Sequence, residues 1–346
     1  MDLLAKLKKT NLTGRGGAGF PVWRKWEAVK EAPGKTKYLV INGSEGEPGI
    51  KKDFHILKNF LEDFFYGLDL AVNFFSIKRA FFYLNPSYYA LLEKDLRRRQ
   101  PAYLEIVKKP KDAGYIGGEE TAVLNALENK KIEPRLRPPF PTVSGLFACP
   151  TLVHNIETLY QIALLAKDEY RQEKFYTING DCLWTGVYSK PENWTIKQVL
   201  IETDNYPDFP FFVQVGGDAS GLVLNMDQLK QAVGGAGSIT VYSQSKHAPL
   251  DLIRGWIDFF ARQSCGQCTP CREGTYRLQK IFSERTPDWA LAGEILSALA
   301  DTSFCALGRS VPIPIRSYIN NVLKRSDASL WPDFPMAAAQ DLCACF

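Results

Sequence analysis

The most constraining feature of this 346-residue chain is a run of three cysteines with two residues between neighbours. Cys265, Cys268 and Cys271 form this C-x2-C-x2-C run, and Cys305 follows further along the chain. Three thiolates at this spacing can cover one face of an iron–sulfur cubane, and a remote fourth thiolate completes the ligand set. Structural zinc sites more often pair two C-x2-C motifs, although four thiolates also bind zinc. The pattern predicts a [4Fe–4S] cluster, with zinc or unligated thiols as alternatives.

Composition places the chain among ordinary globular proteins. Hydrophobic residues make up 45% of it, charged residues 23%, and the formal net charge is +4, so we expect neither disorder nor a strong polyanion-binding field. No apolar stretch is long enough to span a membrane, and the N-terminus lacks the pattern of an export signal. We therefore expect a cytoplasmic protein whose cysteines serve metal chemistry. Cys149 and Cys182 are expected to be small buried hydrophobes. Cys343 and Cys345 are expected to lie in a tail, with ligation of a partner's metal as the alternative.

Strands alternating with helices are expected in the first half of the chain, which favours a mostly parallel sheet. The expected strands are 37–42, 79–84 and 104–107, and the expected helices are 1–13, 23–31, a long helical region to residue 71, a segment after Pro86 to residue 99, and 119–128. After about residue 170, short strands at 175–178, 183–188, 211–215 and 238–242 indicate a small β-rich module. The pattern is helical again from residue 249, including 250–262 and 289–300.

Three glycine-bearing loops are candidates for ligand binding. Residues 14–19 fit G-x-G-x-x-G, but a helix instead of a strand is expected before them, so the Rossmann context is missing. Bare amides and a following helix N-terminus still suit a phosphate or a ring, with a plain tight turn as the alternative. The loops 42–49 and 114–121 add carboxylates beside glycines, after a strand and before a helix respectively. Such carboxylates can accept hydrogen bonds from ribose or ribityl hydroxyls.

Together these motifs closely resemble the NADH-binding flavoprotein subunit (51 kDa type) of respiratory complex I and the related diaphorase subunits of hydrogenases and electron-bifurcating enzymes. The resemblance covers about residues 12–325 and rests on the segments 14–21, 45–49, 118–122, 138–141, 155–158 and 264–274. It implies an α/β fold with three parts. These are a Rossmann-like FMN/NAD-binding domain over residues 1–170, a β-grasp (ubiquitin-like) module over 171–246, and a C-terminal helical bundle with the iron–sulfur cluster and a tail over 247–346.

The resemblance also implies one shared site for FMN and NAD(H). Its residues would be Gly14, Arg15, Gly16, Gly17, Ala18, Gly19, Phe20, Lys25, Asn42, Ser44, Glu45, Glu47, Tyr115, Gly118, Glu119, Glu120, Arg137, Val153, His154, Asn155 and Thr158. Phe20 would stack on the adenine, and Glu47, Glu120 and Arg137 would contact the nucleotide. No side chain is expected to act as a catalytic acid or base, because the hydride passes between cofactors.

Some positions depart from the family pattern. Ser44 and His154 stand where the family has an aspartate and an asparagine, Gly117 replaces a cysteine, and Arg137 replaces a lysine. An imidazole close to the flavin would raise the flavin potential and make it dependent on pH, because positive charge stabilises the anionic reduced ring. A purely structural histidine is the alternative for His154.

The resemblance implies an NAD(P)H-oxidising or NAD-reducing subunit that passes electrons from FMN to a [4Fe–4S] cluster. Its partners would be other electron-transfer subunits of a larger complex, including a [2Fe–2S] thioredoxin-like subunit, with no nucleic acid and no membrane span of its own. The protein would be cytoplasmic, attached to the membrane through partners if at all. The alternative is a non-catalytic or retuned electron-relay subunit with weakened flavin or nucleotide binding, motivated by Ser44 and His154.

Overall fold

The computed structural model describes residues 2–325 and 335, which form two compact units. Of the described residues, the first unit comprises 2–46 and 50–175, and the second comprises 47–49 and those from 176 onward. The predicted tail with Cys343 and Cys345 lies outside the described residues. The predicted division into three domains stays a prediction.

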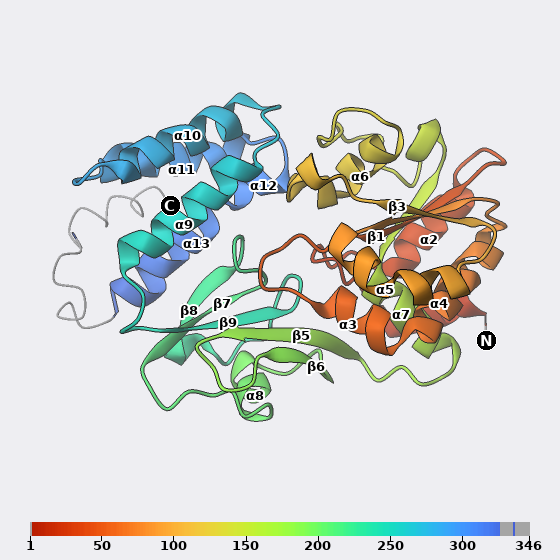
Figure 1. Cartoon of the computed structure of the whole chain (residues 1–346), viewed down its shortest axis with the longest axis horizontal. Coiled ribbons are helices and arrows are strands. Elements are labelled where there is room, and N and C mark those ends of the chain that lie inside the picture. Colours follow the sequence, from red (N-terminus) through yellow and green to blue (C-terminus); the bar gives the residue numbers. More distant parts are fainter. Residues whose placement is uncertain (1, 326–334, 336–346) are drawn as a thin grey trace. The chain divides into compact units, whose positions relative to one another are not determined.

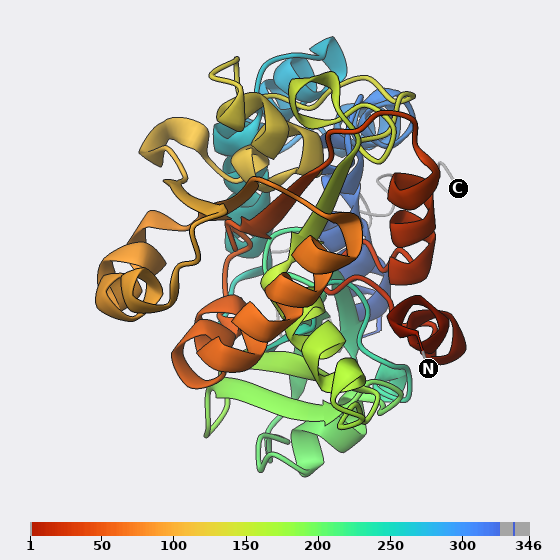
Figure 2. The ribbon, with the colours of Figure 1, turned by 90° about the vertical axis from the view of Figure 1, so that its right-hand side faces the viewer.

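The first unit contains a four-stranded sheet in the order β3-β2-β1-β4, with every neighbouring pair parallel. Its elements are drawn from red to yellow-green in Figures 1 and 2. They are α1 (Leu3–Thr10), α2 (Val22–Glu31), β1 (Tyr38–Gly43), α3 (Lys52–Asn59), α4 (Leu61–Phe75), β2 (Ala80–Leu84), α5 (Pro86–Arg99), β3 (Leu104–Lys108), the short 3-10 helices η1 (Lys111–Ala113) and η2 (Ile116–Gly118), α6 (Glu120–Leu127), η3 (Leu146–Ala148), β4 (Thr151–Asn155) and α7 (Ile156–Ala166).

Helices cover both faces of this sheet, which explains why its strands read as continuous apolar runs. On one face, Val40 and Val153 pack with Val123 and Leu124 of α6. On the other face, Phe82 of β2 packs against Phe64 of α4, with ring centroids 5.2 Å apart. The α/β fold class expected from the alternating pattern is therefore confirmed. The strand β4 was not expected, because its five residues include three polar side chains.

The second unit contains a five-stranded mixed sheet in the order β6-β5-β9-β7-β8 and a group of helices. Its elements are β5 (Glu173–Gly180), β6 (Gly186–Pro191), α8 (Ile196–Ile201), β7 (Phe211–Val215), β8 (Leu222–Asn225), η4 (Met226–Gln228), β9 (Ser238–Ser243), α9 (Pro249–Gln263), α10 (Thr269–Ser283), α11 (Trp289–Thr302), α12 (Ala306–Ser310), α13 (Pro312–Tyr318) and the π-helix η5 (Ile319–Leu323). β5 begins in the last residues of the first unit.

The sheet of the second unit also has two covered faces. One face packs against α8 through Ile178, Val213 and Val199. The other face carries Phe212, which stacks on Tyr242 at 5.2 Å and contacts Tyr318 of α13 at 5.1 Å. A mixed sheet crossed by one short helix agrees with the expected β-grasp module, and the helices from α9 onward agree with the expected helical part. No helix among the described residues is long and apolar enough to cross a membrane.

Candidate functional site

The ends of β1 and β4 define the place where a ligand should bind in the first unit. The chain runs outward from β1 through β2 to β3 on one side, whereas β4 lies on the other side of β1. Ligands of open α/β sheets bind at such a topological switch point, beyond the carboxyl ends of the strands. Asn42 and Asn155 are direct partners in the parallel ladder; Asn155 ends β4, and Asn42 is the next-to-last residue of β1. Both residues belong to the set predicted to bind flavin.

The glycine loop 14–19 is held beside these strand ends. Its own ends are joined by a hydrogen bond from the Gly14 N–H to the Phe20 carbonyl, and the Arg15 N–H donates to the Thr158 hydroxyl at 2.9 Å. A Cβ added at Gly16 would lie 3.5 Å from the Asn155 Cβ. A Cβ added at Gly19 would meet no atom within 4 Å. The loop therefore offers bare backbone next to Asn155, which fits a phosphate or ring ligand.

Phe20 follows the loop with 46% of its surface exposed. An exposed aromatic ring at the edge of a glycine loop is available for stacking on a base. The Arg15 side chain runs elsewhere, because its Nη2 lies 3.5 Å from the Glu173 carbonyl. Arg15 thus contributes to the loop through its backbone.

The second and third predicted loops meet through Asn42. Its amide group donates to the Gly118 carbonyl at 2.8 Å, and its Oδ1 accepts from the Ser44 hydroxyl at 2.8 Å. A Cβ added at Gly118 would lie 2.6 Å from the Ser44 Oγ, so a side chain there would displace the Ser44 hydroxyl. A Cβ added at Gly46 would lie 3.7 Å from the Tyr115 ring. The two loops are therefore in contact, as the shared-site prediction requires.

The two glutamates at the start of α6 have different roles. Glu119 is the N-cap of α6 and accepts from the Thr121 and Ala122 N–H groups at 2.8 and 3.0 Å. Its other carboxylate oxygen pairs with Arg137. Glu120 pairs with Lys25 at 2.5 Å and with Arg137 at 3.4 Å. These charges form an alternating acidic and basic group at a helix N-terminus, where a nucleotide's anionic and hydroxyl groups can both find partners.

Val153 and Thr158 both contact other residues of the predicted site. The Lys25 ammonium lies 3.4 Å from the Val153 carbonyl, while Thr158 holds the glycine loop as described above. The structure thus brings most of the predicted site residues together in the first unit. Two other predicted residues make different contacts: Glu47 is grouped with the second unit, and the His154 side chain is buried within the first.

Glu47 packs with the second unit. Its carboxylate accepts from the Ala219 N–H at 3.0 Å and from the Ser220 N–H at 3.2 Å. A Cβ added at Gly217 would lie 2.2 Å from the Glu47 Oε1, and one added at Gly49 would lie 2.0 Å from Asp218. Two glycines therefore permit the segments 47–49 and 217–220 to interlock.

His154 lies in the sheet with its imidazole buried against Trp26 of α2. Only 4% of its surface is exposed, and its Nε2 accepts a hydrogen bond from the Trp26 indole N–H at 2.9 Å. Burial, and secondarily the charge of Lys25, lowers the pKa of His154 well below its ordinary value. Neighbouring residues of a strand point to opposite faces, so His154 faces away from the side used by Val153. The structure therefore favours the structural alternative for this histidine.

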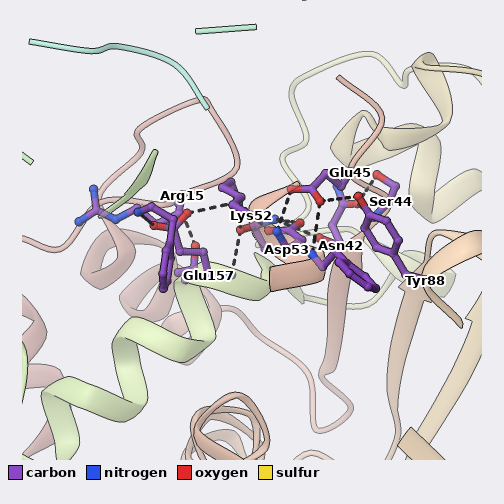
Figure 3. A network of polar contacts seen from close by, with 12 residues as sticks. Arg15, Asn42, Ser44, Glu45, Lys52, Asp53, Tyr88 and Glu157 are labelled. Atoms are coloured by element: carbon purple, nitrogen blue, oxygen red, sulfur yellow. Dashed lines mark hydrogen bonds and ion pairs between the residues drawn. The ribbon is translucent and has the colours of Figure 1, made fainter. Parts of the chain in front are cut away.

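A network of buried charges supports the strand ends and was not predicted from sequence (Figure 3). We call Lys52, Asp53, Asn155 and Glu157 the Lys52 network. The Lys52 ammonium lies 2.6 Å from Asp53, 3.3 Å from Glu157 and 3.0 Å from the Asn155 Oδ1. Asn155 donates in turn to Asp53 at 2.6 Å. The three charged residues are at most 3% exposed, so the network fixes Asn155 at the switch point.

The protonation of Lys52 follows from its surroundings. Burial alone would lower the pKa of Lys52, but the surrounding carboxylates, Asp53 first among them, outweigh it and raise that pKa above its ordinary value. Lys52 therefore stays charged and compensates the carboxylates around it. A lysine–aspartate pair directly after an acidic loop was the only signal in the sequence for this arrangement.

Glu45 extends this buried region toward α5. Its carboxylate accepts from the Asp53 N–H at 2.8 Å and from the Tyr88 hydroxyl at 2.7 Å. Burial, followed by repulsion from Asp53, raises the pKa of Glu45 from 4.5 to about 7. The carboxyl group therefore takes up a proton near neutral pH.

This pKa predicts a measurable pH dependence of stability. For an acid whose folded-state pKa is raised, folding favours the protonated form, so stability is highest below the unfolded pKa and falls as pH rises toward the folded pKa. Between about pH 4.5 and 7, we expect the parent chain to lose about 2–3 kcal/mol of unfolding free energy through Glu45. Glu45→Gln should lack this loss, which urea unfolding of the flavin-free chain at a series of pH values will measure.

Glu31→Gln is the matched control, because Glu31 is exposed at the end of α2. Its stability profile should run parallel to that of the parent. If the Glu45→Gln profile also runs parallel to the parent, the carboxyl group does not titrate in this range.

The four predicted cluster ligands lie in the second unit at the ends of helices. Cys265 and Cys268 lie in the turn between α9 and α10, Cys271 lies in the first turn of α10, and Cys305 is the N-cap of α12. Burial, then repulsion from the other three cysteines, raises the pKa of Cys271 to about 11. The four thiols are therefore within electrostatic reach of one another.

The arrangement differs from a site for a single ion. Among the described residues, no group of three or more His, Cys, Asp or Glu side chains could hold a metal ion. In a cubane each thiolate binds a different iron, so the four sulfur atoms remain further apart than the ligands of one ion. Four thiols that influence one another electrostatically, but that do not surround a single ion, are compatible with the wider ligand spacing of a cubane. Cys149 and Cys182 are only partly buried, although they were expected to be buried.

Comparison with known proteins agrees with both parts of the site. Residues 7–164 match the family described as the Nuo51 FMN-binding domain. Residues 251–326, which include all four candidate ligands, match the iron–sulfur binding region of NADH-ubiquinone oxidoreductase F. The fold and the site therefore define an oxidoreductase with an FMN-binding domain and an iron–sulfur region.

Relatives extend the match to almost the whole chain. The chain is 33% identical to the F subunit of the NADH-quinone oxidoreductase of Streptomyces coelicolor over 359 residues, which covers 91% of this chain and 80% of that protein. It is 28% identical to the Aquifex aeolicus protein of the same name over 360 residues, covering 89% and 81%. The chain belongs to the family of NADH-quinone oxidoreductase F subunits, whose members are NADH dehydrogenase-type oxidoreductase subunits.

A solved structure of an NAD+-reducing [NiFe]-hydrogenase in the H2-reduced state shares the fold. Its TM-score is 0.83 at 29% sequence identity, and the match covers 97% of this chain. The chain spans 65% of the length of that hydrogenase chain. The common fold therefore occurs in a longer protein as well.

Proposed function

We propose that this chain exchanges a hydride with a nicotinamide nucleotide through FMN and passes single electrons to a [4Fe–4S] cluster held by Cys265, Cys268, Cys271 and Cys305. FMN supplies the conversion between two-electron hydride chemistry and one-electron transfer. The chain's own residues bind and orient the reactants, since hydride transfer requires alignment more than acid–base catalysis. The observation that supports this most is the meeting of three predicted loops at one sheet switch point, in a chain that also carries four cysteines within electrostatic range of one another.

The residues of the first unit divide the binding between them. The glycine loop and Asn155 would hold the flavin and its phosphate through bare amides and an amide side chain. Phe20 would stack on the adenine, since its ring is already exposed. Glu120 and Arg137 would contact the nucleotide from the start of α6. The resemblance assigns Glu47 as an acceptor for the nucleotide's hydroxyl or carboxamide groups, in which case NADH would compete for its carboxylate with the Ala219 and Ser220 N–H groups.

The chain would work as one component of a larger assembly. Its relatives are named as subunits of a quinone oxidoreductase, and the structural match comes from a hydrogenase. A one-electron carrier must receive what the cluster releases, and a [2Fe–2S] thioredoxin-like subunit is the partner that we expect. We place the assembly in the cytoplasm, with any membrane attachment through partner subunits.

The test is anaerobic reduction of the flavin by NADH. The purified full chain should show flavin absorbance that NADH bleaches. Glu120→Gln and Glu47→Gln should each weaken NADH binding about tenfold, because each removes one charge-assisted acceptor. Flavin content and the cluster spectrum should not change, since neither residue lies among the cysteines.

Glu105→Gln is the control, because Glu105 is an exposed carboxylate of the same unit, paired with Arg79. It should bind NADH like the parent. If Glu120→Gln and Glu47→Gln also reduce like the parent, the nucleotide site is wrongly assigned. If NADH and NADPH both leave the parent flavin oxidised, the proposed activity itself is refuted.

A further inference from the structure

A buried hydroxyl without a partner lies beside the candidate cluster ligands. Ser303 is the C-cap of α11, two residues before Cys305, and 1% of its surface is exposed. Its Oγ has no hydrogen-bond partner among the residues that the structure describes. A buried hydroxyl that makes no hydrogen bond costs free energy, so such a group usually has a partner that completes it. The group that completes the hydrogen bonding of Ser303 must therefore lie next to its Oγ.

The backbone of Ser303 is fixed on both sides. Its N–H donates to the Leu299 carbonyl at 3.3 Å, which ends α11. Its carbonyl accepts from the Arg309 Nε at 2.8 Å. These bonds hold the Ser303 backbone in place, so the hydroxyl can move only by rotation about the Cα–Cβ bond.

Gly308 shows what Ser303 faces. A Cβ added at Gly308 would lie 2.5 Å from the Ser303 Oγ and 3.2 Å from the Cys271 Cβ. The Ser303 hydroxyl and the Cys271 side chain therefore flank the same α-carbon, and only a glycine leaves room for both. The orphaned hydroxyl is thus adjacent to a predicted cluster ligand.

A second hydroxyl touches the same ligand. The Cys271 thiol lies 3.3 Å from the Ser264 Oγ and donates to it. The Gly266 N–H also donates to this oxygen at 3.3 Å. A serine hydroxyl has one donor and two acceptor positions. Once Cys271 is a thiolate, it has no proton to give, so the Ser264 hydroxyl can donate to the sulfur while it still accepts from Gly266.

We propose that Ser264 and Ser303 are hydrogen-bond donors to the sulfur atoms around Cys271 and that they raise the reduction potential of the cluster. This inference rests on the proposed ligation by the four cysteines. Reduction adds negative charge to the sulfur atoms, so a donated hydrogen bond stabilises the reduced state more than the oxidised state. Hydrogen bonds to the sulfur atoms are known to change the reduction potentials of iron–sulfur clusters. The potential of this cluster is therefore set in part by two residues that bind no iron.

The experiment is a potentiometric titration of the cluster in the full chain with FMN bound, followed by electron paramagnetic resonance. Ser264→Ala and Ser303→Ala should each lower the midpoint potential. The expected size is about a tenfold change in the ratio of oxidised to reduced cluster at a fixed potential, which is about 59 mV for one electron. Ser264→Thr keeps the hydroxyl and should retain the parent potential.

The control variant is Ser283→Ala. The Ser283 hydroxyl bonds to the Lys280 carbonyl at the far end of α10, about 18 Å along the helix from Cys271. Its midpoint potential should equal that of the parent. If Ser264→Ala and Ser303→Ala also match the parent, the proposal is refuted.

A second measurement covers the case in which Ser303→Ala fails to hold the cluster. Resonance Raman spectra of the parent in H2O and D2O should differ in the iron–sulfur stretching bands, because exchangeable hydroxyl protons bond to sulfur. Ser264→Ala should reduce that difference. Identical parent spectra in the two solvents would overturn the proposal. A parent without any iron–sulfur chromophore would instead overturn the assignment of the ligands, and this inference with it.

Discussion

Replacing Lys52 with methionine is expected to lower the unfolding free energy of the chain by about 3–5 kcal/mol, because it leaves buried carboxylates without their cation. Asp53 and Glu157 are 1% and 2% exposed and both lie within 3.3 Å of the Lys52 ammonium. Asn155 would lose one partner as well. We therefore expect flavin content to fall together with stability. Urea unfolding and flavin absorbance per chain measure the two effects.

Lys35→Met is the matched control, because it makes the same change at an exposed position of the first unit. It should alter the unfolding free energy by less than about 0.5 kcal/mol. The double variant Lys52→Met with Asp53→Asn removes one of the uncompensated charges, so it should be more stable than Lys52→Met alone. A loss below about 1 kcal/mol in Lys52→Met would show that the buried charges are not coupled as the distances indicate.

Replacing Cys305 with alanine is expected to abolish the [4Fe–4S] cluster. A cubane needs four ligands, and Cys305 is the proposed ligand from outside the C-x2-C-x2-C run. Iron and sulfide should be about four of each per chain in the parent, and the four-iron signal should be lost in the variant. Bleaching of the flavin by NADH should persist, because the residues assigned to the flavin lie in the first unit.

Cys182→Ala is the control for this experiment. Cys182 lies in the β-rich module, and its thiol bonds to the Asn179 carbonyl at 3.4 Å. It should keep the full iron content. Four irons in Cys305→Ala would exclude that residue as a ligand, and zinc in place of iron in the parent would exclude the cluster.

The sequence was sufficient for features that depend on short spacing. The cysteine run, the glycine loop and the alternation of strands with helices are all readable within windows of a few residues. Their chemistry also leaves few alternatives, since three closely spaced thiolates with a remote fourth are typical iron–sulfur ligands. The fold class and the two cofactors followed from these local patterns and from the resemblance that they carry.

The features that escaped prediction depend on partners far along the chain. Lys52 and Glu157 are charged residues that local rules assign to the surface. They are buried because residues more than 100 positions apart meet at the strand ends. β4 was not predicted because its polar residues interrupt the apolar pattern that is typical of a buried strand. The face of the sheet to which His154 points depends on the register of β4 against β1, and no local sequence pattern encodes that register.

The interlock of Glu47 and Gly49 with residues 217–220 has a consequence for how this chain can be divided. Three residues from the middle of the first unit's sequence are structurally part of the second unit. A fragment that ends at residue 175 would carry Glu47 without the Ala219 and Ser220 N–H donors. No single cut therefore yields two complete modules. Gene fusions or exchanges that recombine the halves of such proteins must keep the short segment and the distant loop as a matched pair.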